Sequence, residues 1–463
     1  MAIKVEQRSG QVIQPVGQPL IFVVSDNSTV STLFKVKFIA EVFVEVTDPN
    51  PFTGTPVATF KTTPNNAGVG IFDFSKVVES YVKADNEAAN GSEYKGTTTT
   101  DETYHVLQTV DKFSKNNNVL RNFTVRFAIE GAATADDDPT EVDSTAITPM
   151  KLFNGYVKHT DQLFRATVGG TSNNIYFDTN PFNVGGSLGS STTRFLTNAP
   201  KTQYAKIEDY GTLSFLRPSN GLGSAKFIYY DSTGSSLGND TVTNPPAYTS
   251  QSDDNLLHLG CFPANLRNWS STFQTIITND TLDYYTVQLF DDTTPTAVAF
   301  SEIITIYRRC PDLMDYESVR LCWLNQYGVW DYYTFTKKST RSVSTQGTQY
   351  TQLEGTWNEN LYRYDSYKGG RKAYRVNSKE TITINTDFVN EAESIWFEEL
   401  INSPEVYVVN GYQTDPANFI LNTYIEPARL ITSSYIRQTI ANDQLMQYTF
   451  EIEKSKTLRT QAV

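Results

Sequence analysis

The sequence predicts a mainly β protein made of several antiparallel β-sandwich domains, with one or two short helices packed on the sheets. Three observations lead to this fold class. Apolar and charged side chains alternate over long stretches, which is the period of a half-buried strand. Aromatic residues are abundant, with 27 Tyr, 27 Phe and 5 Trp, whereas only 19% of the 463 residues are charged. Gly, Pro, Asn and Asp recur at short intervals, as turns between short strands require.

The length is sufficient for about two to four domains, and we expect three. Residues 1–150 are predicted to form an N-terminal β-sandwich with a short helix. Residues 151–310 are predicted to form a middle β-sandwich. Residues 311–463 are predicted to form a C-terminal β domain with a helix and a basic, aromatic arm at 336–379.

The first region contains the clearest strand of the chain, over 34–46. Its inward face is expected to hold Phe34, Val36, Phe38, Ala40, Val42, Val44 and Val46. The same alternation predicts strands over 104–110 and 122–130, the latter with Phe123, Val125, Phe127 and Ile129 inward. Between the strands, a helical stripe runs from Phe74 to Val82, and Asp73 or Ser75 is placed to cap it.

Two polar stretches, 84–103 and 131–148, are expected to be long loops. Residues 84–148 contain twelve acidic and five basic side chains. The cluster Asp136–Asp138, with Glu141 and Asp143, has the oxygen ligands that Ca²⁺ prefers, but it lacks the ligand spacing and bend glycine of an EF-hand. A solvated acidic loop is the favoured interpretation, and calcium binding stays open as the alternative.

The middle region reads as short strands separated by turns, which is typical of a sandwich or barrel. Strands are predicted over 213–216, 225–230, 284–290 and 303–307. The connections from the 170s to 198 and from 241 to 255 are long and polar, so we expect them on an outer surface.

The last region begins with a hairpin whose strands, 319–325 and 329–335, meet at a turn containing Gly328. Further strands are predicted over 381–384, 405–409, 428–432 and 445–453. A helix capped by Thr386 or Asp387 is expected to place these residues at helical spacing: Phe388, Ala392, Ile395, Trp396, Glu399 and Leu400.

The residue types argue against an enzyme. The chain has three His and three Cys, and it has neither a nucleophile elbow nor a phosphate-binding lysine loop. His258, Cys261, Cys310 and Cys322 lack the paired spacing of a structural zinc site. We therefore predict no catalytic residue, no cofactor and no metal. Paired carboxylates such as Glu398 and Glu399 leave a glycosidase as a weak alternative.

The segment 336–379 stands out by charge, with nine basic and three acidic residues in a chain whose net charge is −13. Such an arm could grip the acidic face of a neighbouring subunit; the competing interpretation is a solvated loop. Nucleic-acid binding is disfavoured because the rest of the chain would repel phosphates. The predicted interface residues are Lys337, Lys338, Arg341, Trp357, Arg363, Lys368, Arg371, Lys372 and Arg375.

Aromatic residues crowd into the same region, from Trp323 to Tyr374. Planar rings with a polar tip suit sugar stacking or protein contacts. We therefore name Trp330 and Trp357 as candidate glycan-stacking residues, whereas about half of the cluster is expected to be hairpin core.

The N-terminus shows no apolar stretch of signal-peptide length, and no segment reaches the ~20 apolar residues of a membrane span. We therefore expect synthesis in a reducing cytoplasm and no membrane span.

Several stretches resemble virion structural proteins of tailed bacteriophages, particularly tail-associated proteins of phages of Bacteroidota and of marine type. The resemblance is carried by residues 320–335 (RLCWLNQYGVWDYYTF), 395–408 (IWFEELINSPEVYV), 447–456 (QYTFEIEKSK) and 19–26 (PLIFVVSD). It implies a non-enzymatic tail or baseplate component that resides in the virion after synthesis in the host cytoplasm. Its partners would be other virion proteins and copies of itself. The alternative is a receptor-binding tail protein that recognises host-surface glycan.

Overall fold

The computed structural model confirms a mainly β protein with several antiparallel sheets and five short helices in its described part. The residues that the structure describes are 3–8, 13–44, 54–83, 113–115, 119–147, 149–156, 158, 163–166, 173–176, 193–217, 223–243, 255–291, 298–299, 301–309, 316–358, 360–409, 425–434, 436 and 446–459. The predictions for 84–110, and those for Val46 and Cys310, lie outside these residues.

The chain divides into two compact units, Met1–Arg309 with Leu324–Asp331, and Cys310–Trp323 with Tyr332–Val463. The division at 309 adjoins the boundary expected between the middle and last regions. The further division of the first unit at residue 150 stays a prediction. Across this expected boundary, β7 (Phe113–Lys115) pairs with β17 (Asn255–Gly260).

The first unit begins with two sheets, of order β1-β3-β6 and β2-β10-β8-β4-β5, and β9 pairs with β8. Their elements span Lys4–Gln7 (β1), Ile13–Pro15 (β2), Ile21–Ser25 (β3), Asn27–Thr32 (α1), Phe34–Val44 (β4), Ala58–Thr62 (β5), Val69–Asp73 (β6), Ser75–Glu79 (α2), Leu120–Ala132 (β8), Thr140–Ala146 (β9) and Met150–Phe153 (β10). Phe22 and Phe72 of one sheet share a buried cluster with Phe38 and Phe127 of the other. This arrangement is a β-sandwich.

The predicted inward face of β8 is confirmed, since Phe123, Val125, Phe127 and Ile129 are all buried. The prediction for β4 is wrong at its start, because Phe34 is 53% exposed. The register of β4 against β8 shifts between Phe34 and Lys37, and Lys35 has a φ of 54°. This bulge turns the first residues of β4 away from the core.

The expectation of a loop over 131–148 is wrong at 131–132 and 140–146, which are strand, and it holds at 133–139. β9 pairs antiparallel with β8, from Ala146 opposite Arg126 to Thr140 opposite Gly131. The strand is polar because its residues are exposed or only half-buried. Hydrophobic alternation therefore gave no signal there. Asp137, in the turn before β9, accepts hydrogen bonds from the backbone N–H and the hydroxyl of Thr134.

The remaining strands of the first unit form a two-stranded sheet β11-β12, a sheet of order β14-β17-β7 and a sheet of order β13-β20-β18-β15-β16, with β19 paired to β18. Their elements span Leu163–Ala166 (β11), Asn173–Tyr176 (β12), Thr202–Ala205 (β13), Thr212–Arg217 (β14), Ser224–Tyr230 (β15), Ser236–Thr243 (β16), Pro263–Trp269 (α3), Ser271–Thr278 (α4), Tyr284–Asp291 (β18), Val298–Ala299 (β19) and Ile304–Arg308 (β20). The four strands predicted here are confirmed as β14, β15, β18 and β20. Phe215, Phe227 and Phe273 join the two larger sheets and α4 in one buried cluster.

The second unit is built on a sheet of order β22-β21-β27-β28-β29-β26-β23, with β30 paired to β26 and a separate pair β24-β25. The elements span Val319–Leu324 (β21), Trp330–Phe335 (β22), Thr340–Gln352 (β23), Gly355–Asn358 (β24), Leu361–Tyr364 (β25), Gly370–Asn385 (β26), Glu391–Asn402 (α5), Val406–Val409 (β27), Ile425–Leu430 (β28), Thr449–Lys454 (β29) and Leu458–Arg459 (β30). The predicted hairpin is confirmed as β21 and β22, and its turn residues belong to the first unit.

The predicted helix exists as α5, but its predicted cap is wrong. Asn390 caps the helix by accepting a hydrogen bond from the Glu393 N–H, and the Glu393 carboxylate accepts from the Asn390 N–H. This reciprocal capping box starts the helix after Thr386 and Asp387. Phe388, which precedes the helix, and Ile395 are exposed, whereas Trp396, Phe397 and Leu400 are buried.

Candidate functional site: the arm

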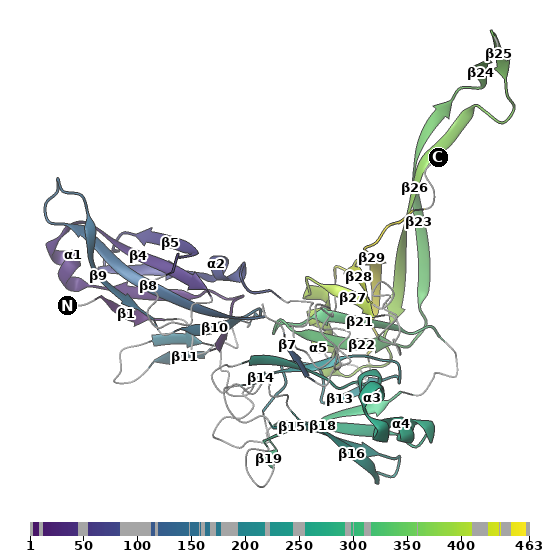
Figure 1. Cartoon of the computed structure of the whole chain (residues 1–463), viewed down its shortest axis with the longest axis horizontal. Coiled ribbons are helices and arrows are strands. Elements are labelled where there is room, and N and C mark those ends of the chain that lie inside the picture. The colour runs from purple at the N-terminus through teal and green to yellow at the C-terminus, as the bar shows by residue number, and fades with distance from the viewer. Residues whose placement is uncertain are drawn as a thin grey trace. The chain divides into compact units, whose positions relative to one another are not determined.

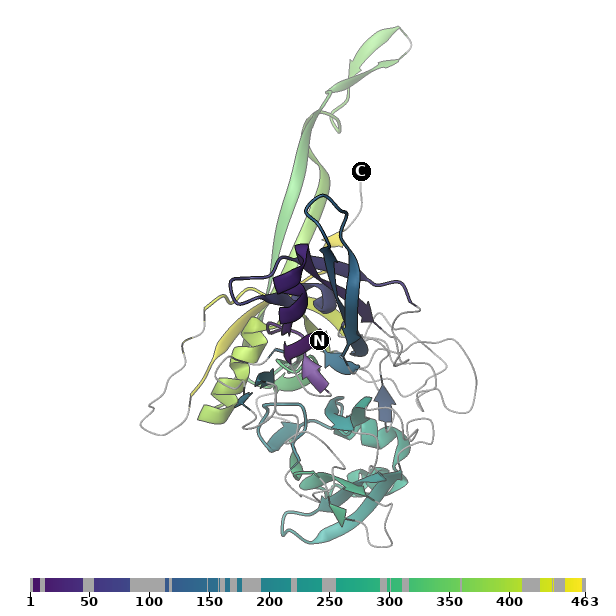
Figure 2. The same ribbon diagram turned by 90° about the vertical axis from the view of Figure 1, so that its left-hand side faces the viewer.

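The arm, residues 336–379, is an antiparallel ribbon that continues β23 and β26 beyond the rest of their sheet (Figure 1). Figure 2 shows the same ribbon from a view turned by 90°. β23 pairs with β26 from Thr340 opposite Thr383 to Gln352 opposite Gly370. On its other edge, β26 pairs with β29 from Thr381 onward and with β30 at Asn377 and Ser378. The outer part of the ribbon is therefore two strands wide within the described chain.

Ion pairs across neighbouring strands hold the base of the arm. Arg341 on β23 contacts Glu317 and, at 2.8 Å, Glu380 on β26. Lys454 on β29 bridges Glu380 at 3.3 Å and Glu426 on β28 at 2.9 Å. Although partial burial of Glu380 opposes the shift, hydrogen bonds from Arg341 and Lys454 lower the pKa of its carboxyl group. These contacts cross-link four strands at the point where the ribbon leaves the sheet.

The tip of the arm, residues 353–369, is a second small hairpin formed by β24 and β25. Trp357 lies opposite Tyr362 in its register. Asp365 fixes the return to the ribbon: its carboxylate accepts a hydrogen bond from Thr356 at 2.9 Å and pairs with Lys368 at 3.1 Å. These two contacts lower the pKa of Asp365. The tip thus has a defined conformation.

The arm exposes an unusual share of apolar surface. The described part of the chain has 22 exposed large apolar side chains, and eight of them are on the arm. These eight, with their exposed fractions, are Val343 (60%), Leu353 (77%), Trp357 (69%), Leu361 (59%), Tyr362 (38%), Tyr364 (77%), Tyr367 (73%) and Tyr374 (56%). Clustered exposed apolar side chains are typical of a binding surface, whereas single ones are ordinary.

The basic residues predicted for the interface are not equivalent. Arg341, Lys337 and Lys368 pair with carboxylates of their own chain: Lys337 lies 3.4 Å from Asp387, and the Arg341 and Lys368 pairs are described above. Lys372 donates to the Tyr367 carbonyl, and Arg375 donates to Asn377. Lys338, Arg363 and Arg371 are exposed, and Lys338 and Arg371 have no ion pair in the described part of the chain. The charge available to a partner is therefore smaller than the residue count indicates.

The two candidate stacking residues have opposite environments. Trp357 is 69% exposed on the tip, whereas only 2% of Trp330 is exposed. A ring with so little accessible surface cannot stack on a sugar, so the assignment of Trp330 was wrong. Its neighbours Tyr327 and Val329 belong to a buried cluster of the first unit with Phe153 and Leu196.

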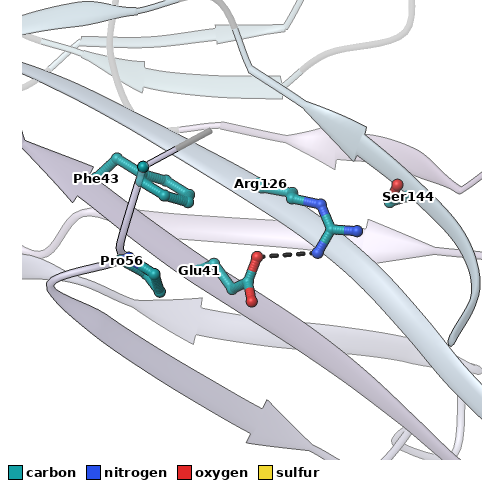
Figure 3. A pocket seen from close by; sticks show the side chains of 6 residues that line it. Glu41, Phe43, Pro56, Arg126 and Ser144 are labelled. Atoms are coloured by element: carbon teal, nitrogen blue, oxygen red, sulfur yellow. Dashed lines mark hydrogen bonds and ion pairs between the residues drawn. The ribbon is translucent and has the colours of Figure 1, made fainter. Parts of the chain in front are cut away.

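An open pocket on the first sandwich was not anticipated from the sequence (Figure 3). It has a volume of about 410 Å³ and is lined by Glu41, Phe43, Gly54, Pro56, Arg126 and Ser144. Arg126 reaches Glu41 at 2.9 Å and also contacts Glu141. Because two carboxylates neutralise the guanidinium, the pocket has no free cation for an anionic ligand.

A Ser–His pair lies inside the first unit, but solvent does not reach it. The Ser214 hydroxyl is 2.7 Å from His258 Nδ1, and the two residues are 3% and 1% exposed. Burial lowers the pKa of His258 to about 3. A substrate cannot approach such a pair, so the contact is structural. Cys261 and Cys322 are buried free thiols.

A row of tyrosines has no local sequence pattern, because its members are spread over about a hundred residues. Tyr204, Tyr307, Tyr284 and Tyr230 lie in register on four adjacent strands. Successive ring centroids are 5.7, 5.0 and 4.8 Å apart. Partial desolvation and the neighbouring phenols raise the pKa of Tyr284. Such cross-strand pairs stabilise a sheet.

Among the described residues, no group of three or more His, Cys, Asp or Glu side chains is arranged to hold a metal ion. The described helices include none with the length and apolar character needed to cross a membrane.

Comparisons with known proteins assign no family. No family model and no curated protein matches the chain. Among solved structures, a cryo-EM reconstruction of native E. coli alpha-2-macroglobulin is similar over 82% of this chain, at 7% identity and a TM-score of 0.18. The chain spans 22% of that protein. A likeness this weak carries no argument about fold or function.

Proposed function

We propose that this protein is a non-enzymatic assembly subunit, and that the arm binds a neighbouring subunit. One observation carries the proposal: the arm is a built, conformationally defined extension whose apolar side chains have no covering layer in the described chain. Burying apolar surface contributes about 25 cal/mol per Å², and aromatic anchors dominate binding energy at interfaces. The tip concentrates such anchors at Trp357, Tyr364 and Tyr367.

Charge supports the same function. The arm has nine basic and three acidic residues, and the chain as a whole has a net charge of −13, so the rest of the chain carries −19. Opposite charges on arm and body favour contact between copies, and they set the register of that contact. Arm-to-body contact of this kind is heterologous, which builds rings or filaments.

We further propose that the assembly is the tail or baseplate of a tailed-bacteriophage virion. This part of the proposal rests on the sequence resemblance alone. The partners would be copies of the chain and other virion proteins.

Deleting the tip tests the proposal. Gln352 and Gly370 are register partners, so a two-residue Asn-Gly turn can replace 353–369 and close the ribbon. Light scattering is expected to show a defined oligomer above a dimer for the full chain, weakened by salt, and loss of that oligomer for the tip deletion. Circular dichroism and thermal unfolding check that the deletion variant is folded. A full-size oligomer without the tip would refute the proposal.

Glycan binding at the host surface is a second candidate, and the exposure of Trp357 favours it. Aromatic faces stack on sugars. This candidate predicts saturable binding of host polysaccharide by the full chain, lost in Trp357→Ala and retained in Trp330→Phe, which alters a buried ring. Equal polysaccharide binding by wild type and Trp357→Ala would exclude the candidate.

A further inference from the structure

From Ser342 onward, the outer edge of β23 lacks the features by which proteins protect exposed strand edges. β23 is the last strand of its sheet, so one row of its backbone N–H and C=O groups has no partner strand in the described chain. Natural edges of this kind carry Lys, Pro or inward charges that prevent pairing with another chain. From Ser342 to Leu353 the sequence is SVSTQGTQYTQL, with no charged residue and no proline.

The regular part of this edge is long enough to hold a strand. β23 spans 13 residues, and its register against β26 is regular until a shift between Thr348 and Gln349. Gly347 lies in this part with both neighbours exposed. A Cβ there would lie 3.5 Å from Val376, an ordinary contact. The packing of the arm therefore leaves room for a side chain at position 347. Glycine at this position instead favours the close approach of a second backbone.

We infer that the edge of β23 pairs antiparallel with β23 of a second copy of this chain, which makes a four-stranded ribbon from two arms. This inference rests on the proposed function in treating the arm as an assembly contact, and it adds an isologous contact to that of the tip.

Charge distribution identifies the second copy as the occupant. The basic residues Arg371, Lys372 and Arg375 lie on β26, the strand away from the free edge. In the paired ribbon the two β26 strands are three strand spacings apart, about 14 Å, which exceeds the Debye length of about 8 Å at physiological salt. Residues 342–348 of the two central strands are Ser, Val, Thr, Gln and Gly, with no charged side chain, so like charges do not oppose each other there. An acidic strand of another protein would gain little at this uncharged edge.

Paired charge variants test the inference in the tip-deleted protein, where the tip cannot contribute. Ser342 and Gln346 are exposed, and their partners within the arm, Thr381 and Asn377, are uncharged. The Ser342→Lys/Gln346→Lys variant should therefore keep the ribbon intact but place like charges in the paired edge. The Ser342→Glu/Gln346→Glu variant does the same with opposite sign. The matched control is Ser342→Thr/Gln346→Asn, which adds no charge.

Sedimentation velocity of the tip-deleted protein should show a concentration-dependent dimer. Each charged variant alone should dimerise at least tenfold more weakly, the uncharged control should match the parent, and a 1:1 mixture of the Lys and Glu variants should restore the dimer at low salt. A tip-deleted parent that stays monomeric, a Lys variant that dimerises normally, or a mixture no better than its components would each overturn the inference.

The outcomes separate this inference from the proposed function. If the full chain assembles but the tip-deleted parent is monomeric, tip-mediated assembly survives and edge pairing fails. If tip deletion leaves the full-size assembly unchanged and the Lys variant abolishes it, edge pairing survives and the role of the tip fails.

Discussion

Acidification should destabilise the first unit through His258. This residue lies on β17, 1% exposed, with Nδ1 at 2.7 Å from the Ser214 hydroxyl. Its Nε2 is buried and has no hydrogen-bond partner in the described structure. A proton added there would place an unpaired charge in the core, which is why burial lowers the pKa of His258 to about 3 from its ordinary value of 6.5.

The magnitude follows from linkage between protonation and folding. Since the folded pKa is depressed, the unfolded chain binds the proton first as the pH falls below 6.5. Folding stability then decreases by about 1.4 kcal/mol per pH unit until the folded pKa is reached. His258 alone should therefore contribute a loss of about 2 kcal/mol between pH 8 and pH 5, and about 5 kcal/mol by pH 3.

Urea unfolding between pH 8 and pH 5 measures this loss, with His258→Gln as the variant that cannot titrate. The variant is expected to be less stable than wild type at pH 8, and the difference should shrink by about 2 kcal/mol at pH 5. Ser214→Ala is the control, because it removes the hydrogen bond but keeps a buried imidazole and hence the pH dependence. A stability difference between wild type and His258→Gln that is constant with pH would refute the reasoning.

Two further predictions concern the turn and the base of the arm. Gly328 has a φ of 70°, and a Cβ there would lie 1.5 Å from the Asn154 carbonyl oxygen; Gly328→Ala should therefore cost more than about 3 kcal/mol of unfolding free energy, and a Tm within 2 °C of wild type would contradict this. Glu380→Gln removes the shared partner of Arg341 and Lys454 and should cost about 1 kcal/mol at pH 7. Because the pKa of Glu380 is lowered in the fold, this stabilisation should decrease as the pH falls below 4.5 toward the folded pKa, and a cost at pH 3 equal to that at pH 7 would count against it.

Local sequence pattern was sufficient where one face of a strand is buried and the other is solvated. β29 shows this, since Phe450 and Ile452 are buried whereas Thr449 and Glu451 are exposed. The pattern failed at β9, because both faces of this polar strand are partly exposed and its pairing depends on the neighbouring strand β8. Such register information is not contained in the segment itself.

The cap of α5 could have been found from the sequence. Asn390-Glu-Ala-Glu393 is the spacing of a capping box, with the acceptor three residues before a glutamate, whereas Thr386 is followed three residues later by Val389. The prediction relied on the apolar stripe rather than on the capping residues, and it therefore started the helix too early. The tyrosine row and the ion-pair network at the base of the arm have no comparable local signal, because their members come from strands far apart in sequence.

Strand β26 shows why composition alone could not separate core from surface in the aromatic region. Along this one strand, Ile382 and Ile384 are buried, whereas Tyr374 is 56% exposed. The buried end belongs to the part of the sheet that Phe450 of β29 and Phe397 of α5 line, with ring centroids 5.7 Å apart. The exposed end runs into the ribbon, where the described chain supplies no second layer.

Whether an aromatic residue is core therefore depends on the presence of a covering layer, which is a property of the fold. Trp323 has such a layer in Trp396, at 4.9 Å between ring centroids, and it is fully buried. Trp357 has none, although it lies in an equally regular strand pair. A monomer gains no stability from keeping a tryptophan and several tyrosines uncovered on the tip, whereas an assembling subunit gains binding energy when a neighbour covers them. The tip deletion measures that difference directly.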